Sequence, residues 1–400
     1  MKYTRREFGK VALAAVPAVA LFDKFGTETL LGQARPNSMV NGVQIGTITY
    51  SYRQMPDQSA EATLKYILDS GISAVEIMGG PVESFAGIPR MEPVGGGGRG
   101  PGGPGGPGGG RGPGGGRAAA EPPPGAKMGS WPGTGATCVL QEEGAGRAGG
   151  GGGGGRGRGT PGELTPEQQA ARAAQEEFTK KVKDWRTTVS MEPFKKLRKM
   201  YNDAGVSIYA WKQLSTNMSD EEFEYVFNVA EALGATHTTL ELPAGPEAAA
   251  QLKRIGDFAM KKKIYAAYHT HLQGSMTCFD EAFAISKGNM ANVDLGHWTA
   301  GGNQGGSQMD FLNKYHARTA SFHLKDRTTP EHCGLNLAWG TGETPIKEIL
   351  QLVRKNKWKI PGSVEFEYAI PEGSDAVQEV RKCVEYCKAA LSAPMTTASR

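Results

Sequence analysis

Short β-rich runs alternate with amphipathic helical stretches from residue 42 onward, and this alternation restricts the fold more than any other feature. Eight runs rich in β-branched and aromatic residues are predicted strands, at residues 43–51, 74–79, 206–212, 237–243, 264–271, 291–297, 319–326 and 362–368. A helical pattern follows each run. Eight βα units in series, without the break of a doubly wound sheet, favour an α/β fold of the closed (β/α)8 TIM-barrel type. An open Rossmann-type sheet is the alternative.

One segment interrupts this pattern between the second strand and its helix. Residues 93–160 consist mainly of glycine, arginine and proline and hold most of the 57 glycines of the chain. A segment with few side chains to bury cannot offset the entropy lost on ordering its backbone. We therefore predict a disordered insertion within a TIM-barrel catalytic domain that spans residues 42–392. Its place after a barrel strand puts it on the active-site side, where a free spacer is favoured over a cover for the site.

The N-terminus has the pattern of an export signal. Arg5 and Arg6 precede the apolar stretch 11–22, which is too short for a stable membrane span. The pair resembles a bacterial twin-arginine signal, so we predict a signal peptide and linker over residues 1–34, a periplasmic location and the twin-arginine translocation machinery as a partner. Five cysteines show no framework spacing, and an odd number leaves at least one unpaired. Cys383 and Cys387 are expected to be half-buried thiols.

Ionisable side chains gather where the predicted strands end, which is where TIM barrels place their catalytic groups. They are Glu76, Lys212, Glu241, His269, His271, Asp294, His297, His323, Lys325, Asp326, Glu365 and Glu367. Taken singly, each has a structural explanation: Asp294 could accept from backbone amides, and His323 could be a core histidine. If such explanations applied to all of these residues, many ionisable groups would lie unpaired at one end of a dry barrel, which is energetically costly. Mixed oxygen and nitrogen ligands suit Mn, Co, Zn or Fe(II) better than calcium.

Three motifs resemble the xylose-isomerase-like sugar phosphate isomerase/epimerase superfamily. They are D-x-x-H in "VDLGHW", H-x-K-D in "SFHLKDR" and the late glutamate in "SVEFEY", in that order after "YHTH". The resemblance covers residues 42–392 apart from the insertion. It implies a TIM barrel with one divalent ion, commonly Mn with Co, Zn, Fe or Mg as alternatives. Matched by motif, Asp294, His323 and Glu365 would be ligands.

The remaining ligand is where this chain departs from the family. Its epimerases carry a glutamate on the fifth strand, where this chain has His269 in "YHT". Either His269 binds the ion instead, or Glu241 on the neighbouring strand takes the position. Glu241 is the favoured alternative.

Such a site predicts an isomerase or epimerase that removes a proton next to the carbonyl of a sugar or sugar derivative. His269, His271 and Glu367 are the candidate catalytic groups, and Glu76, His297 and Lys325 the candidate substrate contacts. Export disfavours phosphorylated sugars.

Other functions stay open. A metal-dependent lyase or dehydratase would start with the same proton removal on keto-sugars, keto-glycosides or inositols. A non-catalytic periplasmic sugar-binding barrel would have a broken ligand set, whereas only one position departs here. Nucleic-acid binding through the "GRG" repeats is disfavoured by the scarcity of aromatic residues among them and by the export signal. A homo-oligomer is compatible with the sequence.

Overall fold

The computed structural model describes residues 35–91, 128–131, 135–139 and 165–394. The predicted signal peptide, residues 1–34, lies outside the described residues, and so does most of the predicted insertion. Among the described residues, no helix is long and apolar enough to cross a membrane.

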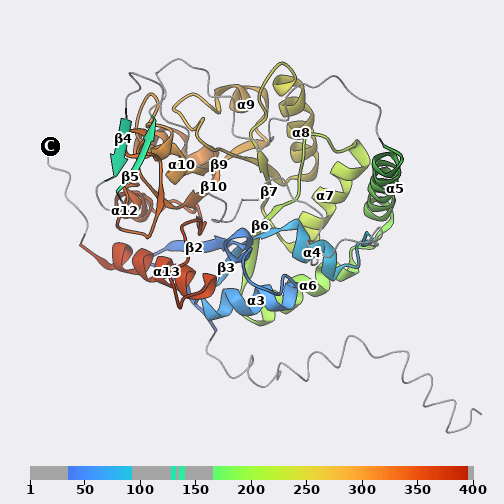
Figure 1. Cartoon of the computed structure of the whole chain (residues 1–400), viewed down its shortest axis with the longest axis horizontal. Coiled ribbons are helices and arrows are strands. Elements are labelled where there is room, and N and C mark those ends of the chain that lie inside the picture. Colours follow the sequence, from blue (N-terminus) through green and yellow to red (C-terminus); the bar gives the residue numbers. More distant parts are fainter. Residues whose placement is uncertain (1–34, 92–127, 132–134, 140–164, 395–400) are drawn as a thin grey trace, which may run out of the picture.

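Eight parallel strands close into a barrel, which confirms the predicted (β/α)8 fold (Figure 1). In chain order they are β2 (Val43–Ile48), β3 (Ala74–Met78), β6 (Ser207–Lys212), β7 (His237–Glu241), β8 (Tyr265–His269), β9 (Asn289–Asp294), β10 (Thr319–Leu324) and β13 (Gly362–Val364). Each pairs in parallel with its neighbours, and the pairing of β13 with β2 closes the ring. The short β1 (Met39–Val40) adds to β2 in antiparallel orientation. All eight predicted strands are present, and the open sheet is excluded.

Helices follow the strands and surround the barrel (Figure 1). They are α3 (Ala60–Asp69), α4 (Gly79–Phe85), α5 (Pro166–Thr188), α6 (Glu192–Asp203), α7 (Asp220–Leu233), α8 (Ala248–Lys262), α9 (Asp280–Ile285), α10 (Leu295–Ala300), α11 (Gln308–Tyr315), α12 (Ile346–Asn356) and α13 (Ala376–Ser392). Helix α7 illustrates how particular residues set the two ends of a helix. Ser219 and Glu222 form a reciprocal capping box at its start, and Gly234 ends it at φ +76°.

The barrel interior is polar. His237, Asn292 and Ser321 are buried on three different strands. The Ser321 hydroxyl lies 2.9 Å from His237 Nε2 and accepts from Asn292 Nδ2 at 2.7 Å. TIM barrels are more often filled with branched apolar side chains. Here a hydrogen-bonded layer lies beneath the strand ends and supports the groups above it.

A two-stranded hairpin lies within the segment predicted to be disordered. It consists of β4 (Met128–Trp131) and β5 (Ala136–Val139), and a disulfide joins Cys138 to Cys333 in the loop after β10. Trp131 packs edge-on against His332 with ring centroids 5.1 Å apart. The loop containing Cys333 is therefore tied to the insertion, a pairing that the sequence analysis did not predict. Cys383 and Cys387 are free and fully buried rather than half-buried.

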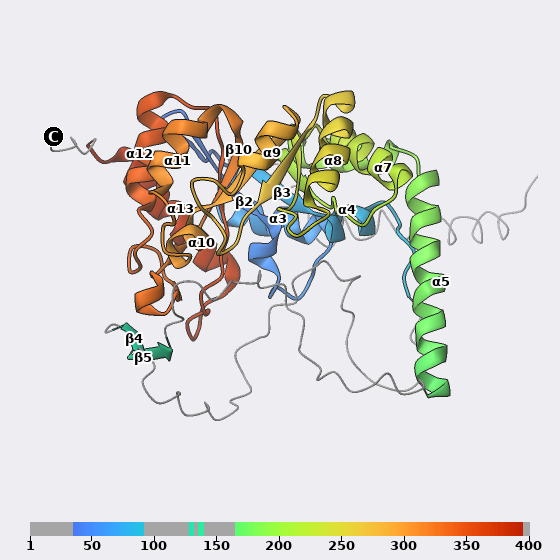
Figure 2. The ribbon, with the colours of Figure 1, turned by 90° about the horizontal axis from the view of Figure 1, so that it is seen from above.

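Helix α5 extends beyond the barrel on the same side as the hairpin (Figure 2). Thr165 and Gln168 form its capping box, and most of its side chains are exposed. Near its C-terminus, Arg186 donates from Nε to the buried carboxylate of Glu83 at 2.9 Å. This ion pair attaches the helix to α4. The helical pattern predicted after the insertion is thus two helices, α5 and α6, with Pro193 in the first turn of the second.

Candidate metal centre

Four side chains at the ends of adjacent strands converge on one buried point. His269, Asp294, His323 and Glu365 each offer a ligand atom, and these atoms all lie within 4.8 Å of one another. His269 and Asp294 are the last residues of β8 and β9, His323 is near the end of β10, and Glu365 directly follows β13. Consecutive parallel strands end at one rim, so four neighbouring strands deliver the four groups together.

His269 presents one free ring nitrogen to this point. Its Nδ1 lies 3.0 Å from Asn292 Oδ1, an acceptor, so Nδ1 carries the proton and Nε2 has the lone pair. Burial and the nearby Lys212 ammonium lower the pKa of His269 to about 3. The imidazole is therefore neutral, as a ligand must be, and is a poor group for accepting a proton. This environment favours a ligand role over the catalytic role predicted from the sequence.

His323 lies between two carboxylates. Its Nε2 is 2.8 Å from Glu76 Oε2, and its Nδ1 is 2.8 Å from Glu365 Oε2. Glu76 is fully buried and also accepts from Thr239 Oγ1 at 2.7 Å. Because the side chain has no accessible surface, its position disfavours the substrate-binding role predicted for Glu76. It holds the far edge of the His323 ring, as carboxylates do behind metal-binding histidines.

Asp294 is both a candidate ligand and a helix cap. Its Oδ1 accepts from the backbone N–H of His297 at 2.6 Å, which starts helix α10. The D-x-x-H spacing therefore follows from cap geometry, and it fixes His297 beside the cluster. The other oxygen, Oδ2, is buried and makes no well-aligned hydrogen bond among the described residues, and its ion-pair neighbour is Lys325 Nζ at 3.1 Å.

Lys325 is a buried cation in contact with three acidic residues. Its Nζ lies 2.7 Å from Glu367, 2.9 Å from Glu365 and 3.1 Å from Asp294. Its fourth neighbour is His297 Nε2, at 3.1 Å. Since the side chain is 2% exposed, Lys325 acts on the charges around it more than on a substrate. Glu367, which is partly exposed, can reach a ligand.

Glu241 lies outside the cluster. Its carboxylate accepts from Lys212 Nζ at 2.9 Å through Oε1, and its Oε2 lies 3.2 Å from His271 Nε2. Burial would raise the pKa of Glu241, but Lys212 and His271 hold it well below its usual range. The geometry favours His269 over Glu241 as the fourth ligand, contrary to the preference drawn from the sequence. Glu241 instead orients His271, whose pKa it raises.

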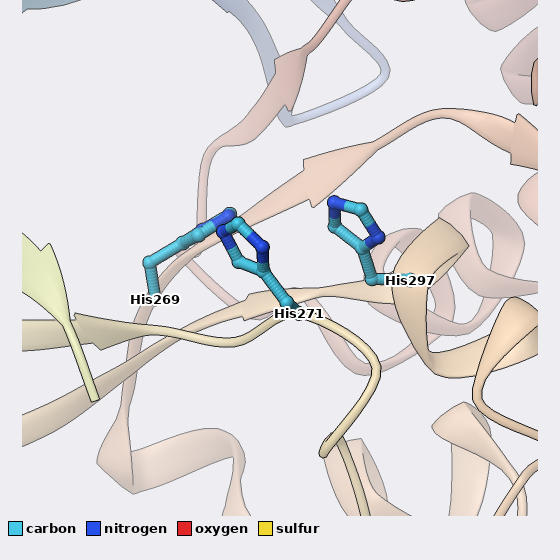
Figure 3. Close-up of side chains that lie close together, drawn as sticks. All are labelled: His269, His271 and His297. Carbon is cyan, nitrogen blue, oxygen red and sulfur yellow. The ribbon is translucent and has the colours of Figure 1, made fainter. Parts of the chain in front are cut away.

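A second group of side chains, His269, His271 and His297, lies at the mouth (Figure 3). Figure 3 shows the three imidazoles turned towards one another, with His271 coming from the loop after β8 and His297 from α10. The rings of His271 and His297 stack with centroids 4.7 Å apart. His297, however, meets Arg327 at Nδ1 and Lys325 at Nε2. Two cations on its ring nitrogens make His297 a poor metal ligand, so the four-residue cluster is the candidate centre.

The charges around the cluster support a divalent cation. Glu76, Asp294, Glu365 and Glu367 supply four negative charges around the cluster, and Lys325, the protonated His323 and Arg327 beside His297 supply three positive charges. One negative charge is in excess, and a second would be in excess if an ion displaced the proton of His323. Burial would lower the pKa of His323, yet Glu76 and Glu365 outweigh it and raise this pKa to about 10. The mixed N/O donor set of the four buried side chains fits one divalent transition metal.

Two residues that contact the site were not predicted from the sequence. Asn292 sets the ring orientation of His269, and Arg327 contacts His297. Asn292 stands two residues before Asp294, so strand alternation placed it on the same inward face. Arg327 directly follows the H-x-K-D motif, but nothing in its spacing indicates that it turns towards α10.

Comparisons with known proteins give structural neighbours only. No protein-family model and no curated protein matches the chain significantly. A xylose isomerase domain protein from Alicyclobacillus acidocaldarius is similar at 12% identity and a TM-score of 0.48, covering 88% of this chain and 100% of its own. A sugar phosphate isomerase/epimerase from Parabacteroides distasonis has 14% identity and a TM-score of 0.47, covering 88% and 95%. An L-ribulose 3-epimerase has 10% identity and a TM-score of 0.46, covering 87% and 94%. With TM-scores below 0.5, these neighbours add nothing to the barrel topology described above.

Proposed function

We propose that the protein is a divalent-metal-dependent isomerase or epimerase that acts on a sugar or sugar derivative by removing a proton next to a carbonyl. The observation that carries this proposal is the buried convergence of His269, Asp294, His323 and Glu365. These residues would hold one ion, with manganese expected and Co, Zn, Fe or Mg as alternatives. When bound, a divalent ion supplies Lewis acidity, which polarises a carbonyl and acidifies the adjacent C–H.

His271 is the proposed base. Its imidazole is accessible, with a side chain 43% exposed, and its Nε2 lies 3.2 Å from Glu241. A carboxylate behind an imidazole fixes its orientation and stabilises the protonated form. Lys212 in turn holds Glu241 in place. The Lys212–Glu241–His271 chain thus prepares one nitrogen to take a proton at the mouth of the barrel.

Glu367 is the proposed group on the other side of the substrate. Lys325 donates to Glu367 at 2.7 Å and keeps this carboxylate oriented. A second proton-carrying group is what separates epimerisation from simple exchange, because the proton must return to a different face or carbon. His271 and Glu367 follow strands β8 and β13, which do not pair with each other in the barrel.

We also propose that the protein is exported. The Arg5–Arg6 signal supports this proposal, and so does the Cys138–Cys333 disulfide, because disulfides persist in oxidising compartments. Fractionation of cells that express the full chain would contradict export if the mature protein stayed in the cytoplasm.

Metal binding and proton exchange test the proposed activity separately. We expect calorimetry to show one Mn2+ site in the metal-stripped protein, and Asp294→Asn to weaken binding at least 100-fold. His271→Ala should keep the ion and lose at least 100-fold in the rate of sugar C–H exchange in D2O, followed by NMR. Equal turnover with and without chelator would overturn the proposal. Exchange with loss of water would identify elimination instead.

A further inference from the structure

His297 has a hydrogen-bonding conflict at the mouth of the site. Its Nδ1 contacts Arg327 Nη1, and its Nε2 is 3.1 Å from Lys325 Nζ. A neutral imidazole accepts at one nitrogen and carries a proton on the other. Whichever tautomer forms, one N–H of His297 points at a cationic donor. The site therefore contains more donors than acceptors at this point.

Arg327 adds further hydrogen-bond donors that have no acceptor in the described part of the chain. Its Nε donates to the carbonyl oxygen of Gly334 at 3.1 Å, its Nη2 donates to the same oxygen, and Nη1 meets His297. A guanidinium has five N–H groups, so one remains on each terminal nitrogen. Among the described residues, no carboxylate lies within ion-pair distance of Arg327, although its side chain is largely enclosed. Lys325, by contrast, already has three acidic partners.

The missing acceptor must come from the mouth. His297 and Arg327 are partly exposed, as is His271 beside them, while Lys325 is buried. Two remaining N–H groups on one guanidinium match the two oxygens of a carboxylate, the bidentate geometry for which arginine is suited. The surrounding acids do not compete for this position, because Lys325 holds Glu365 and Glu367.

We propose that the substrate carries a carboxylate that binds the free N–H groups of Arg327, so that the site takes sugar acids in preference to neutral sugars. The inference rests on the proposed function in taking a sugar as the ligand. It narrows the substrate class to polyhydroxy acids whose carboxylate is anchored at Arg327.

Matched ligand pairs test this proposal by calorimetry on the full chain. D-Glucuronate is compared with D-glucose, and D-galacturonate with D-galactose, because each pair differs only in a carboxylate. We expect the acid to bind at least 10-fold more tightly. Arg327→Met should remove this preference by weakening the binding of the acids at least 10-fold more than that of the neutral sugars. Arg327→Lys keeps the positive charge but loses the paired N–H groups of the guanidinium, so it should recover part of the preference for the acids. Arg172→Met, on the exposed face of α5, is the control and should change nothing.

Several outcomes would overturn the proposal. They are equal affinities within each pair, an equal loss for acid and neutral sugar on Arg327→Met, and tighter binding of glucose 6-phosphate than of glucuronate. If Arg327→Met fails to fold, judged by circular dichroism, the Arg327→Lys result decides. Failure of the proposed function gives a different result. Preference for uronates without metal-dependent C–H exchange would support the carboxylate site and contradict the isomerase function.

Discussion

Glu76 fixes the His323 imidazole from inside the barrel. With Nε2–H donated to Glu76, Nδ1 is the nitrogen of His323 that faces Glu365 and Asp294, and loss of its proton would leave a lone pair there for an ion. Thr239 and Asn292 hold Glu76 in turn. A carboxylate in this position orients the ring and increases its basicity, so its effect on a bound ion is indirect but large.

Glu76→Gln tests this role. The amide keeps the size of the side chain but loses the charge, so we expect Mn2+ affinity to fall about 10- to 100-fold in calorimetry. Glu241→Gln is the matched control, because that carboxylate contacts Lys212 and His271 and no group of the cluster; its Mn2+ affinity should be unchanged. A loss in Glu241→Gln as large as in Asp294→Asn would make Glu241 the ligand after all.

At the scale of elements, the hairpin β4–β5 secures the loop between β10 and α12. The disulfide at Cys333 directly precedes Gly334, whose carbonyl oxygen holds Arg327. His332, on the other side of Cys333, contacts Trp131 of the hairpin and Glu343 within the same loop. The hairpin therefore limits the freedom of the loop that places Arg327.

Removing the disulfide should destabilise the protein measurably. We expect Cys138→Ser to lower the free energy of unfolding by about 2–4 kcal/mol, because the cross-link closes a long loop in the unfolded chain. A reductant should lower the melting temperature of the wild type to that of the variant and leave the variant unchanged. Cys278→Ser, at a free cysteine, serves as the control. Equal melting temperatures of reduced and oxidised wild type would contradict the prediction.

The elements were predictable where local periodicity decides them. Each barrel strand is a β-rich run with a helix behind it, and Ser219 or Gly234 marks where α7 begins and ends. The hairpin was not predictable in this way, because its strands are four residues each and lie in a glycine-rich segment. The pairing of Cys138 with Cys333 spans 195 residues, and spacing cannot indicate a bond of that kind.

At the scale of the whole molecule, barrel closure determines which strand ends meet. The motifs that resemble the isomerase/epimerase superfamily implied Asp294, His323 and Glu365 as ligands, and these residues lie at the ends of adjacent strands. The sequence could not separate His269 from Glu241, since the two residues face each other in the register of β7 and β8. The difference comes from partners on other strands: Lys212 on β6 pairs with Glu241, while Asn292 on β9 holds His269. Such partners become visible only in the closed barrel.

The polar interior of the barrel also makes stability depend on pH. His237 is buried between the hydroxyls of Thr236 and Ser321, each 2.9 Å from a ring nitrogen. Burial lowers its pKa to about 4 in the folded protein, against about 6.5 in the unfolded chain. Between about pH 4 and pH 6.5, His237 is therefore protonated in the unfolded chain and neutral in the folded protein. Stability is therefore unaffected above pH 6.5 and falls as the pH drops towards 4.

His237→Gln removes this contribution. Between pH 7 and pH 5, we expect the wild type to lose about 2 kcal/mol more of its free energy of unfolding than the variant loses, measured by urea denaturation at each pH. The variant will be less stable at pH 7, because its amide cannot reproduce both contacts, so the test compares the two slopes and not the absolute values. His316→Gln, at a partly exposed histidine stacked on Trp358, should keep the wild-type slope. Parallel curves for wild type and His237→Gln would show that His237 takes up its proton in the folded barrel as readily as in the unfolded chain.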